Sequence, residues 1–244
     1  MYQEHPSFET PENKNGKIWR FMDFTKFVDI LVSRSLYFCR SDLLGDPFEG
    51  TYSQFTIDEF LKQAKNKDEQ DRIRGFFIKQ PTEWRKTSFL NCWYMDDIEP
   101  AGMWKSYTTS NQAIAIQSTF EKLVKSFEEN NVYRLFIGKV KYIDYKKDSI
   151  PWGNAFNPLL YKRHNFKHES ELRAAVVDFG FLEGDKNPRV GHRVETNLNK
   201  LIEEIRIAPT APDWFKNIVQ TIIEKFDLDK PITNSELDER PPVS

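Results

Sequence analysis

The opening of the chain alternates between two apolar patterns, and this alternation is the feature that most constrains the fold. Lys17–Asp23 (KIWRFMD) and Ser35–Arg40 (SLYFCR) are rich in the aromatic and large apolar residues that strands favour. Between them, Phe24–Ser33 spaces its apolar residues as one face of a helix does. The pattern predicts a strand, an amphipathic helix and a second strand, so the helix must bury its apolar face against a sheet.

The rest of the chain repeats this mixture. Further strands are predicted at residues 87–95, 112–118, 134–145, 169–181 and 200–208. Helical spacing predicts two short helices within 56–77, one turn at 103–108 and longer helices at 120–130 and 212–226, while 156–166 is irregular or helical. We therefore predict an α+β fold, with a mixed core of strands and flanking helices.

The domain organisation follows from length and from the absence of breaks in the sequence. A chain of 244 residues is long for one average domain and short for two, and no repeat, linker or low-complexity block divides it. We predict a polar lead-in at residues 1–16, a single domain at 17–228 and a tail at 229–244.

Charge and cysteine content limit the classes of function. Lys plus Arg total 35 and Asp plus Glu 37, so the net charge of −2 provides no global attraction to nucleic acid or to an anionic membrane. The composition leaves a local nucleic-acid-binding site as an alternative. Cys39 and Cys92 lie far apart in apolar runs, which favours reduced thiols in a cytoplasmic protein. Residues 1–16 lack the apolar core of a signal peptide, and no run approaches a membrane span in length, so no membrane association is expected.

Glu169 and Glu171 are the first candidates for chemistry. On a strand, Lys167, Glu169, Glu171 and Arg173 would share one face, and His168 would lie in the core behind it. Mutual repulsion can split the pKa values of two such carboxylates. One then stays ionised to stabilise positive charge while the other orients or deprotonates a nucleophile. The alternative is a solvent-facing strand with hydrated charges of both signs.

Arg20 is the second candidate, because it lies between Trp19 and Phe21 in the first predicted strand. A guanidinium can bind a phosphate through two hydrogen bonds while neighbouring aromatic faces stack on a planar ring. The alternative is an arginine that pairs with one of the protein's own carboxylates.

Two shorter motifs carry further candidates. The sequence Gly-Asp-Pro-Phe-Glu at 45–49 predicts a tight turn that presents Asp46 and Glu49, with an ordinary surface turn as the alternative. Trp104 and Tyr107 lie three residues apart on one predicted helix face. They form either a platform for a ligand or part of the core.

The sequence offers one weak candidate for a metal-binding motif. His164 and His168 are four residues apart beside Glu169, a spacing that puts both imidazoles on one side of a helix. The cysteines lack paired spacing and no further ligand is evident, so no metal site is expected. The sequence has no P-loop, Rossmann glycine motif, nucleophile-elbow serine motif or cysteine–histidine framework.

Taken in order, three of these motifs resemble a large bacterial family of uncharacterised function. They are Asp-Pro-Phe-Glu at 46–49, Met-Trp-x-x-Tyr at 103–107 and His-Glu-x-Glu-x-Arg at 168–173. The resemblance covers most of residues 17–209.

The layout also resembles a distant ADP-ribosyltransferase, a fold that holds NAD in a cleft between two small sheets. The resemblance implies that Arg20 is the NAD-binding residue of the first strand and Tyr37 an aromatic residue of the second. It makes Glu171 the catalytic glutamate, which stabilises an oxocarbenium-like transition state, and Glu169 the residue that orients the acceptor. Residues 91–94 stand where these transferases often have a serine-rich strand.

Three hypotheses about function follow. The leading one is an NAD-dependent mono-ADP-ribosyltransferase that acts on a macromolecular target, as a toxin or antiphage effector, with Trp104 and Tyr107 as further NAD contacts. The second is an inactive nucleotide- or protein-binding module with the same fold. The third is a metal-dependent nuclease; its acids would be Asp46, Glu49, Glu169 and Glu171. The sequence predicts neither the acceptor nor the oligomeric state nor the pathway.

Overall fold

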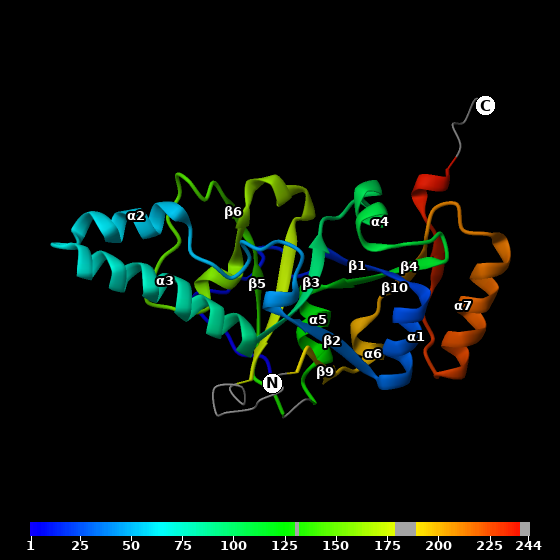
Figure 1. Ribbon diagram of the computed structural model, residues 1–244. Helices are drawn as coiled ribbons and strands as arrows, with labels where there is room; N and C mark the ends of the chain where they lie inside the picture. The colour runs from blue at the N-terminus through cyan, green and yellow to red at the C-terminus, as the bar shows by residue number, and fades with distance from the viewer. Residues whose placement is uncertain (130–131, 179–188, 240–244) are drawn as a thin grey trace.

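The computed structural model describes residues 1–129, 132–178 and 189–239 (Figure 1). It confirms a mixed α+β fold that opens as predicted with β1 (Lys17–Asp23), α1 (Phe24–Ser33) and β2 (Ser35–Arg40). The other strands are β3 (Ser88–Met95), β4 (Ala113–Thr119), β5 (Leu135–Lys139), β6 (Lys141–Ile143), β7 (Tyr161–Arg163), β8 (Glu171–Val177), β9 (Gly191–Glu195), β10 (Glu204–Ile207) and β11 (Ile232–Asn234). The other α-helices are α2 (Gln54–Gln63), α3 (Lys67–Thr87), α4 (Ala101–Tyr107), α5 (Phe120–Ser126), α6 (Leu198–Leu201) and α7 (Asp213–Lys225).

Nine of these strands form one connected sheet. Its main path runs in the order β11-β10-β4-β1-β3-β2-β9, while β8 pairs with β3 and β5 pairs with β8. The pairing of β10 with β11 is parallel and the other pairings within this sheet are antiparallel, so the sheet is mixed. A separate parallel pair joins β6 to β7. In place of the two small sheets implied by the resemblance, the described residues form one large sheet and this pair.

The large sheet divides at β3. One edge of β3 pairs with β8 from Ser88 to Tyr94. The other edge pairs with β2 only through Phe89 and Leu90, and with β1 only through Tyr94 and Met95. Residues 91–93 therefore have no strand partner on this edge among the described residues, and β1 and β2 separate around them. This fork creates room inside the sheet for a cavity.

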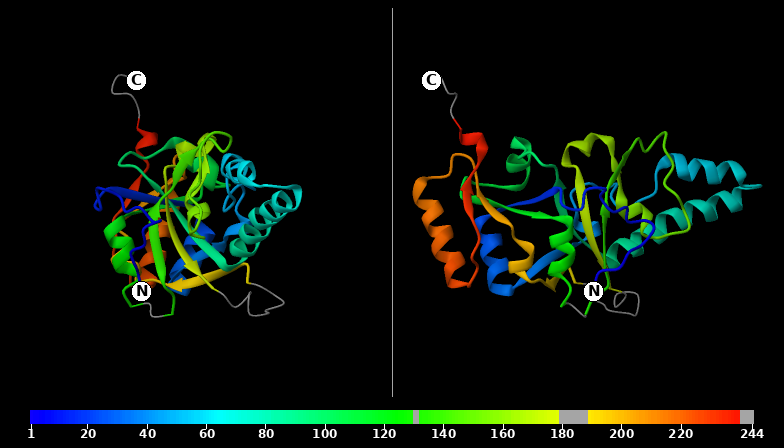
Figure 2. Two further views of the ribbon diagram at one scale, coloured as in Figure 1. Left: turned by 90° about the vertical axis from the view of Figure 1, so that its left-hand side faces the viewer. Right: turned by 180° about the vertical axis from the view of Figure 1, so that it is seen from behind.

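Helices cover both faces of the sheet around the fork (Figure 1). The main core lies where α1, α5 and α7 pack on one face, with Phe27, Leu123 and Phe215 almost fully buried. Burial of one such side chain contributes roughly 1.5–3 kcal/mol. On the other face, α4 packs Met103 and Trp104 against β1. The α2–α3 hairpin projects to one side of the sheet and has a smaller apolar cluster of its own (Figure 2).

Both predicted terminal segments contain described residues that pack on the domain. In the lead-in, Tyr2 bridges to Leu135, and Phe8 is buried against Gly138, where a side chain would meet its backbone. Within the tail predicted at 229–244, β11 pairs with β10. Residues 240–244 lie outside the described part of the chain.

Some element boundaries also differ from the prediction. The strand predicted at 134–145 divides at Val140 into β5, which pairs with β8, and β6, which pairs with β7. The strand predicted at 169–181 begins only at Glu171, after the 3-10 helix His164–Glu169, and its residues 179–181 lie outside the described chain. Within the described ranges, no helix combines the length and apolarity needed to cross a membrane.

Candidate functional site

A cavity of about 900 Å³ opens at the fork of the sheet. Strands β1, β2, β3 and β8 contribute to its wall together with α1, α4 and the loop 44–49. Five residues predicted for the site line it, namely Arg20, Tyr37, Tyr107, Glu169 and Glu171. Its volume lies within the range of small-molecule and cofactor sites. The fold thus gathers side chains from distant parts of the chain around one space.

Trp104 has a different environment from the one predicted. Its ring is buried, packs edge-on against Phe21 at 4.9 Å, and donates from Nε1 to Glu99 at 2.7 Å. Two residues three apart on a helix differ by about 60° in direction, which turns Trp104 to the sheet and Tyr107 to the cavity. The prediction that Trp104 contacts a cofactor is not supported by its position, and this residue anchors α4.

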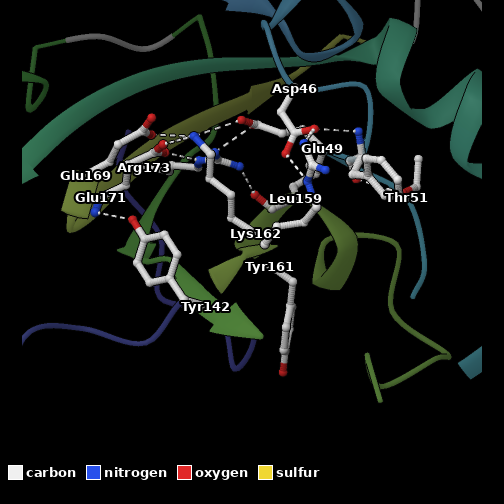
Figure 3. Close-up of polar contacts among 12 residues, drawn as sticks. Asp46, Glu49, Thr51, Tyr142, Leu159, Tyr161, Lys162, Glu169, Glu171 and Arg173 are labelled. Carbon is white, nitrogen blue, oxygen red and sulfur yellow. Dashed lines mark hydrogen bonds and ion pairs between the residues drawn. The ribbon is translucent and has the colours of Figure 1, made fainter. Parts of the chain in front are cut away.

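The floor of the cavity is a buried network of ion pairs (Figure 3). The ammonium of Lys162 contacts Glu171 Oε1 at 2.6 Å, Glu49 Oε1 at 3.0 Å and the carboxylate of Glu169. Arg173 donates from Nε to Glu171 Oε2 at 2.6 Å and from Nη2 to Glu49 Oε2 at 2.7 Å. Its Nη1 donates to the carbonyl of Leu159 at 2.7 Å. Three carboxylates therefore share two cations in a site almost closed to solvent.

This environment separates the pKa values of Glu169 and Glu171. Burial raises the pKa of Glu169, and its contact with Glu171 adds to this, so that the pKa reaches about 7. Burial also raises the pKa of Glu171, but the charges of Arg173 and Lys162 outweigh it and hold this pKa well below its ordinary value. Glu171 is thus a permanent anion, and Glu169 can exchange a proton near neutral pH. Such a split is one of the two alternatives that the sequence left open for this pair.

The predicted strand geometry of the acid pair is wrong. Glu169 ends a 3-10 helix and Glu171 begins β8, so a continuous strand face from Lys167 to Arg173 does not exist. His168, expected in the core, is exposed on that helix. The two glutamates nevertheless reach the same ammonium group, that of Lys162.

Arg20 lies across β3 from this network. Its Nη1 donates to the carbonyl oxygen of Cys92 on β3 at 2.8 Å. Arg173, on β8, pairs with the same residue, Cys92, from the other edge of β3. No carboxylate among the described residues lies within ion-pair distance of Arg20, so the alternative of an internal salt bridge is not observed. Burial lowers the pKa of its guanidinium, yet arginine stays charged at neutral pH. The cavity therefore offers an unneutralised cation.

Tyr37 forms an aromatic part of the wall and is 37% exposed. Its ring lies over Gly191, where an added Cβ would come within 2.2 Å of the ring's Cζ and Oη. Beside it, Asp29 and Arg193 form two hydrogen bonds of 2.7 Å each and also line the cavity. The position of the Tyr37 ring depends on the missing side chain of Gly191.

Lys162 is the residue of the site that sequence analysis missed. It lies within 156–166, predicted as irregular or helical, and the structure places it on the short strand β7. Glu49 and Arg173 belonged to motifs noted in the sequence, but their pairing with each other was not foreseen. A single lysine in a weakly patterned segment carries no local signal of burial.

The geometry does not favour a metal site. Of the four acids in the nuclease hypothesis, Glu49, Glu169 and Glu171 are bound to Lys162 or Arg173. The fourth, Asp46, accepts two hydrogen bonds from Arg163, at 2.8 and 3.1 Å. Across residues 1–129, 132–178 and 189–239, no three acidic, histidine or cysteine side chains are grouped to hold a metal ion.

Comparisons with known proteins leave the family open. No family model matches the chain, and no curated protein matches it. A solved structure similar to this chain is that of Thermus sp. 2.9 DarT in complex with carba-NAD+. The sequence identity is 9% and the TM-score 0.38, over 94% of this chain and 98% of that chain. At this TM-score the likeness carries no argument, and the resemblance to the uncharacterised bacterial family stays a prediction.

Proposed function

We propose that the cavity binds NAD and that the protein is an ADP-ribosyltransferase acting on a macromolecular acceptor. The observation that carries the proposal is the convergence of Arg20, Tyr37 and the pair Glu169–Glu171 on one cavity. These residues come from β1, β2 and the junction between the 3-10 helix His164–Glu169 and β8, far apart in sequence. A role as a toxin or antiphage effector is the corresponding biological proposal.

The charges of the cavity fit those of NAD. The dinucleotide carries a negative diphosphate and a positive nicotinamide ring. Arg20, which has no acidic partner in the described chain, is suited to the diphosphate, and a guanidinium binds phosphate through two parallel hydrogen bonds. The three-carboxylate network on the other side of β3 is suited to the positive end of the ligand. Tyr37 offers a face on which a planar ring can stack.

The split pKa values support distinct roles for the two glutamates. As the bond between ribose C1′ and the nicotinamide nitrogen breaks, its electron pair leaves with nicotinamide and C1′ becomes cationic. Glu171, kept ionised by Arg173, would stabilise that charge. An O–H or N–H group of the acceptor then bonds to C1′ and loses its proton, and Glu169 is the carboxylate able to take it near neutral pH.

One observation favours a second candidate, an inactive module that binds a nucleotide or a protein. Both carboxylate oxygens of Glu171 are already engaged, one by Lys162 and one by Arg173. A catalytic glutamate must exchange at least one such contact for the ribose of the substrate. A structural glutamate would keep both.

Two measurements on the purified protein separate these candidates. Calorimetric titration with NAD measures binding, and chromatography of the same mixture with a cell lysate measures release of nicotinamide. If the protein is a transferase, it binds NAD and releases nicotinamide, and Glu171→Gln abolishes the release. Binding without release identifies the module, and a protein that neither binds nor cleaves NAD refutes both uses of the cavity for this dinucleotide. The matched control is Glu204→Gln, which alters an acid paired with Arg206 outside the cavity wall.

A further inference from the structure

We propose that Ser170 is a positioning residue, whose left-handed backbone brings the carboxylates of Glu169 and Glu171 onto the single ammonium of Lys162. The proposal rests on the proposed function only where it concerns turnover. The arrangement of the two acids is a property of the protein without ligand and can be tested separately.

Ser170 has φ 37° and ψ 53°, a conformation that side chains other than glycine's disfavour. It stands between the end of the 3-10 helix His164–Glu169 and the first residue of β8. Its amide donates to the carbonyl of Lys167 at 3.2 Å and closes the last helical turn. The chain therefore turns sharply at the residue that separates the two acids.

Ser170 is tied to the end of β3 by two hydrogen bonds. Its carbonyl accepts from the amide of Met95 at 2.9 Å, and its Oγ donates to the carbonyl of Met95 at 2.8 Å. On the next residue, the amide of Glu171 donates to the hydroxyl of Tyr142 at 2.8 Å. Glycine would suit the backbone better, but it would lack the Oγ contact. The surroundings thus hold the unfavourable conformation in place.

The consequence is the placement of the two carboxylates. On a regular strand, alternate side chains point the same way at about 6.6 Å spacing along the chain. Here Glu169 is helical and Glu171 extended, and the turn between them lets both contact Lys162. The charged and titratable groups that surround Glu169 are Lys162 on β7, Glu171 and Arg173 on β8, Glu49 in the loop 44–49 and Tyr107 on α4. An extended residue at 170 would move Glu169 out of this group.

Two substitutions separate the backbone from the hydroxyl. Ser170→Gly keeps access to the left-handed conformation and loses Oγ, whereas Ser170→Thr keeps a hydroxyl but adds a branch at Cβ that disfavours this conformation. The readout is the pKa of the Glu169 carboxyl, measured by carbon NMR titration of the ligand-free protein. The control is Asp227→Gly, which alters another residue with positive φ (55°) that is not part of the cavity wall.

We expect Ser170→Gly and Asp227→Gly to keep the pKa of Glu169 near 7, and Ser170→Thr to lower it toward the ordinary value of about 4.3. In an active protein the acidic limb of the pH–rate profile moves with it. An unchanged titration in Ser170→Thr, or a shift in Ser170→Gly but not in Ser170→Thr, overturns the proposal. Should Ser170→Thr fail to fold, Ser170→Ala against Ser170→Asn repeats the comparison, since asparagine adopts left-handed backbone more readily than alanine. A wild-type protein that titrates as expected but never cleaves NAD refutes the proposed function and leaves this proposal standing.

Discussion

Arg20 on β1 donates a hydrogen bond of 2.8 Å to the backbone carbonyl of Cys92 on β3, across the gap where β1 and β2 separate. The contact uses one nitrogen of the guanidinium. The side chain is held in the wall of the cavity, and no acid of the described residues neutralises it. A cation fixed in this way is ready to bind an anion with little loss of side-chain freedom.

Removal of Arg20 should weaken NAD binding. Charge-assisted hydrogen bonds contribute roughly 1.5–3 kcal/mol, so we expect Arg20→Ala to raise the Kd for NAD by about ten- to a hundredfold in calorimetric titration. Arg74→Ala, on the exposed surface of α3, is the control and should leave the Kd unchanged. If Arg20→Ala and the wild type bind NAD with equal affinity, the diphosphate of NAD does not bind at Arg20.

Arg173 should be essential for the stability of the fold. It is fully buried between Glu49 and Glu171, so its loss leaves Lys162 alone to balance these carboxylates in a site closed to water. Breaking a buried pair costs about 3–5 kcal/mol. We expect Arg173→Met to lower the free energy of unfolding by this amount in urea titration. Lys62→Met, which removes an exposed pair with Glu59, should cost less than about 1 kcal/mol. Similar losses in both variants would contradict the network's role.

The rate of transfer should depend on pH through Glu169. A general base acts only when ionised, and the pKa of Glu169 is about 7. We expect nicotinamide release coupled to transfer to rise about tenfold per pH unit below pH 6 and to level off above pH 8. Glu169→Gln should abolish this acidic limb of the pH–rate profile and slow transfer by about 10²- to 10⁴-fold. If the acidic limb persists in Glu169→Gln, a group other than Glu169 is responsible for it.

Gly191 should act on binding through Tyr37. The nearest atoms to a Cβ at position 191 all belong to the Tyr37 ring, so Gly191→Ala must displace that ring. If the Tyr37 ring stacks on NAD, its displacement weakens the binding free energy by about 0.5–1.5 kcal/mol, which is roughly a three- to tenfold loss of affinity. In the Tyr37→Ala background the same substitution should cost nothing further. Equal losses in both backgrounds would show that Gly191 acts independently of Tyr37.

Local patterns in the sequence predict the elements that hold the site but not its centre. The strands β1 and β2 and the helix α1 follow from apolar spacing within each segment, which is a local property. The three-residue strand β11 depends on its pairing with β10 and has no such pattern. The fork at β3 likewise depends on which strands pair along its two edges. Long-range pairing of this kind is not encoded in any one segment.

The errors at the site have the same physical origin. Sequence patterns identified Glu169 and Glu171 as a pair, but the turn at Ser170 depends on hydrogen bonds to Met95 on β3. Lys162 becomes the centre of the network only because the folded chain brings its ammonium to Glu49 and Glu171, which are distant from each other in sequence. Spacing along a helix could not decide whether Trp104 faces a ligand or the sheet, since that depends on what covers α4.

The most direct test of the account is transfer of adenine-labelled NAD to the acid-insoluble fraction of a cell lysate. The transferase predicts label in this fraction with the wild-type protein and with Glu204→Gln, and none above background with Glu171→Gln. Thermal unfolding of each variant verifies that it is folded. No incorporation by the folded wild type across a range of lysates, or equal incorporation by Glu171→Gln, would contradict the proposal that this cavity transfers ADP-ribose.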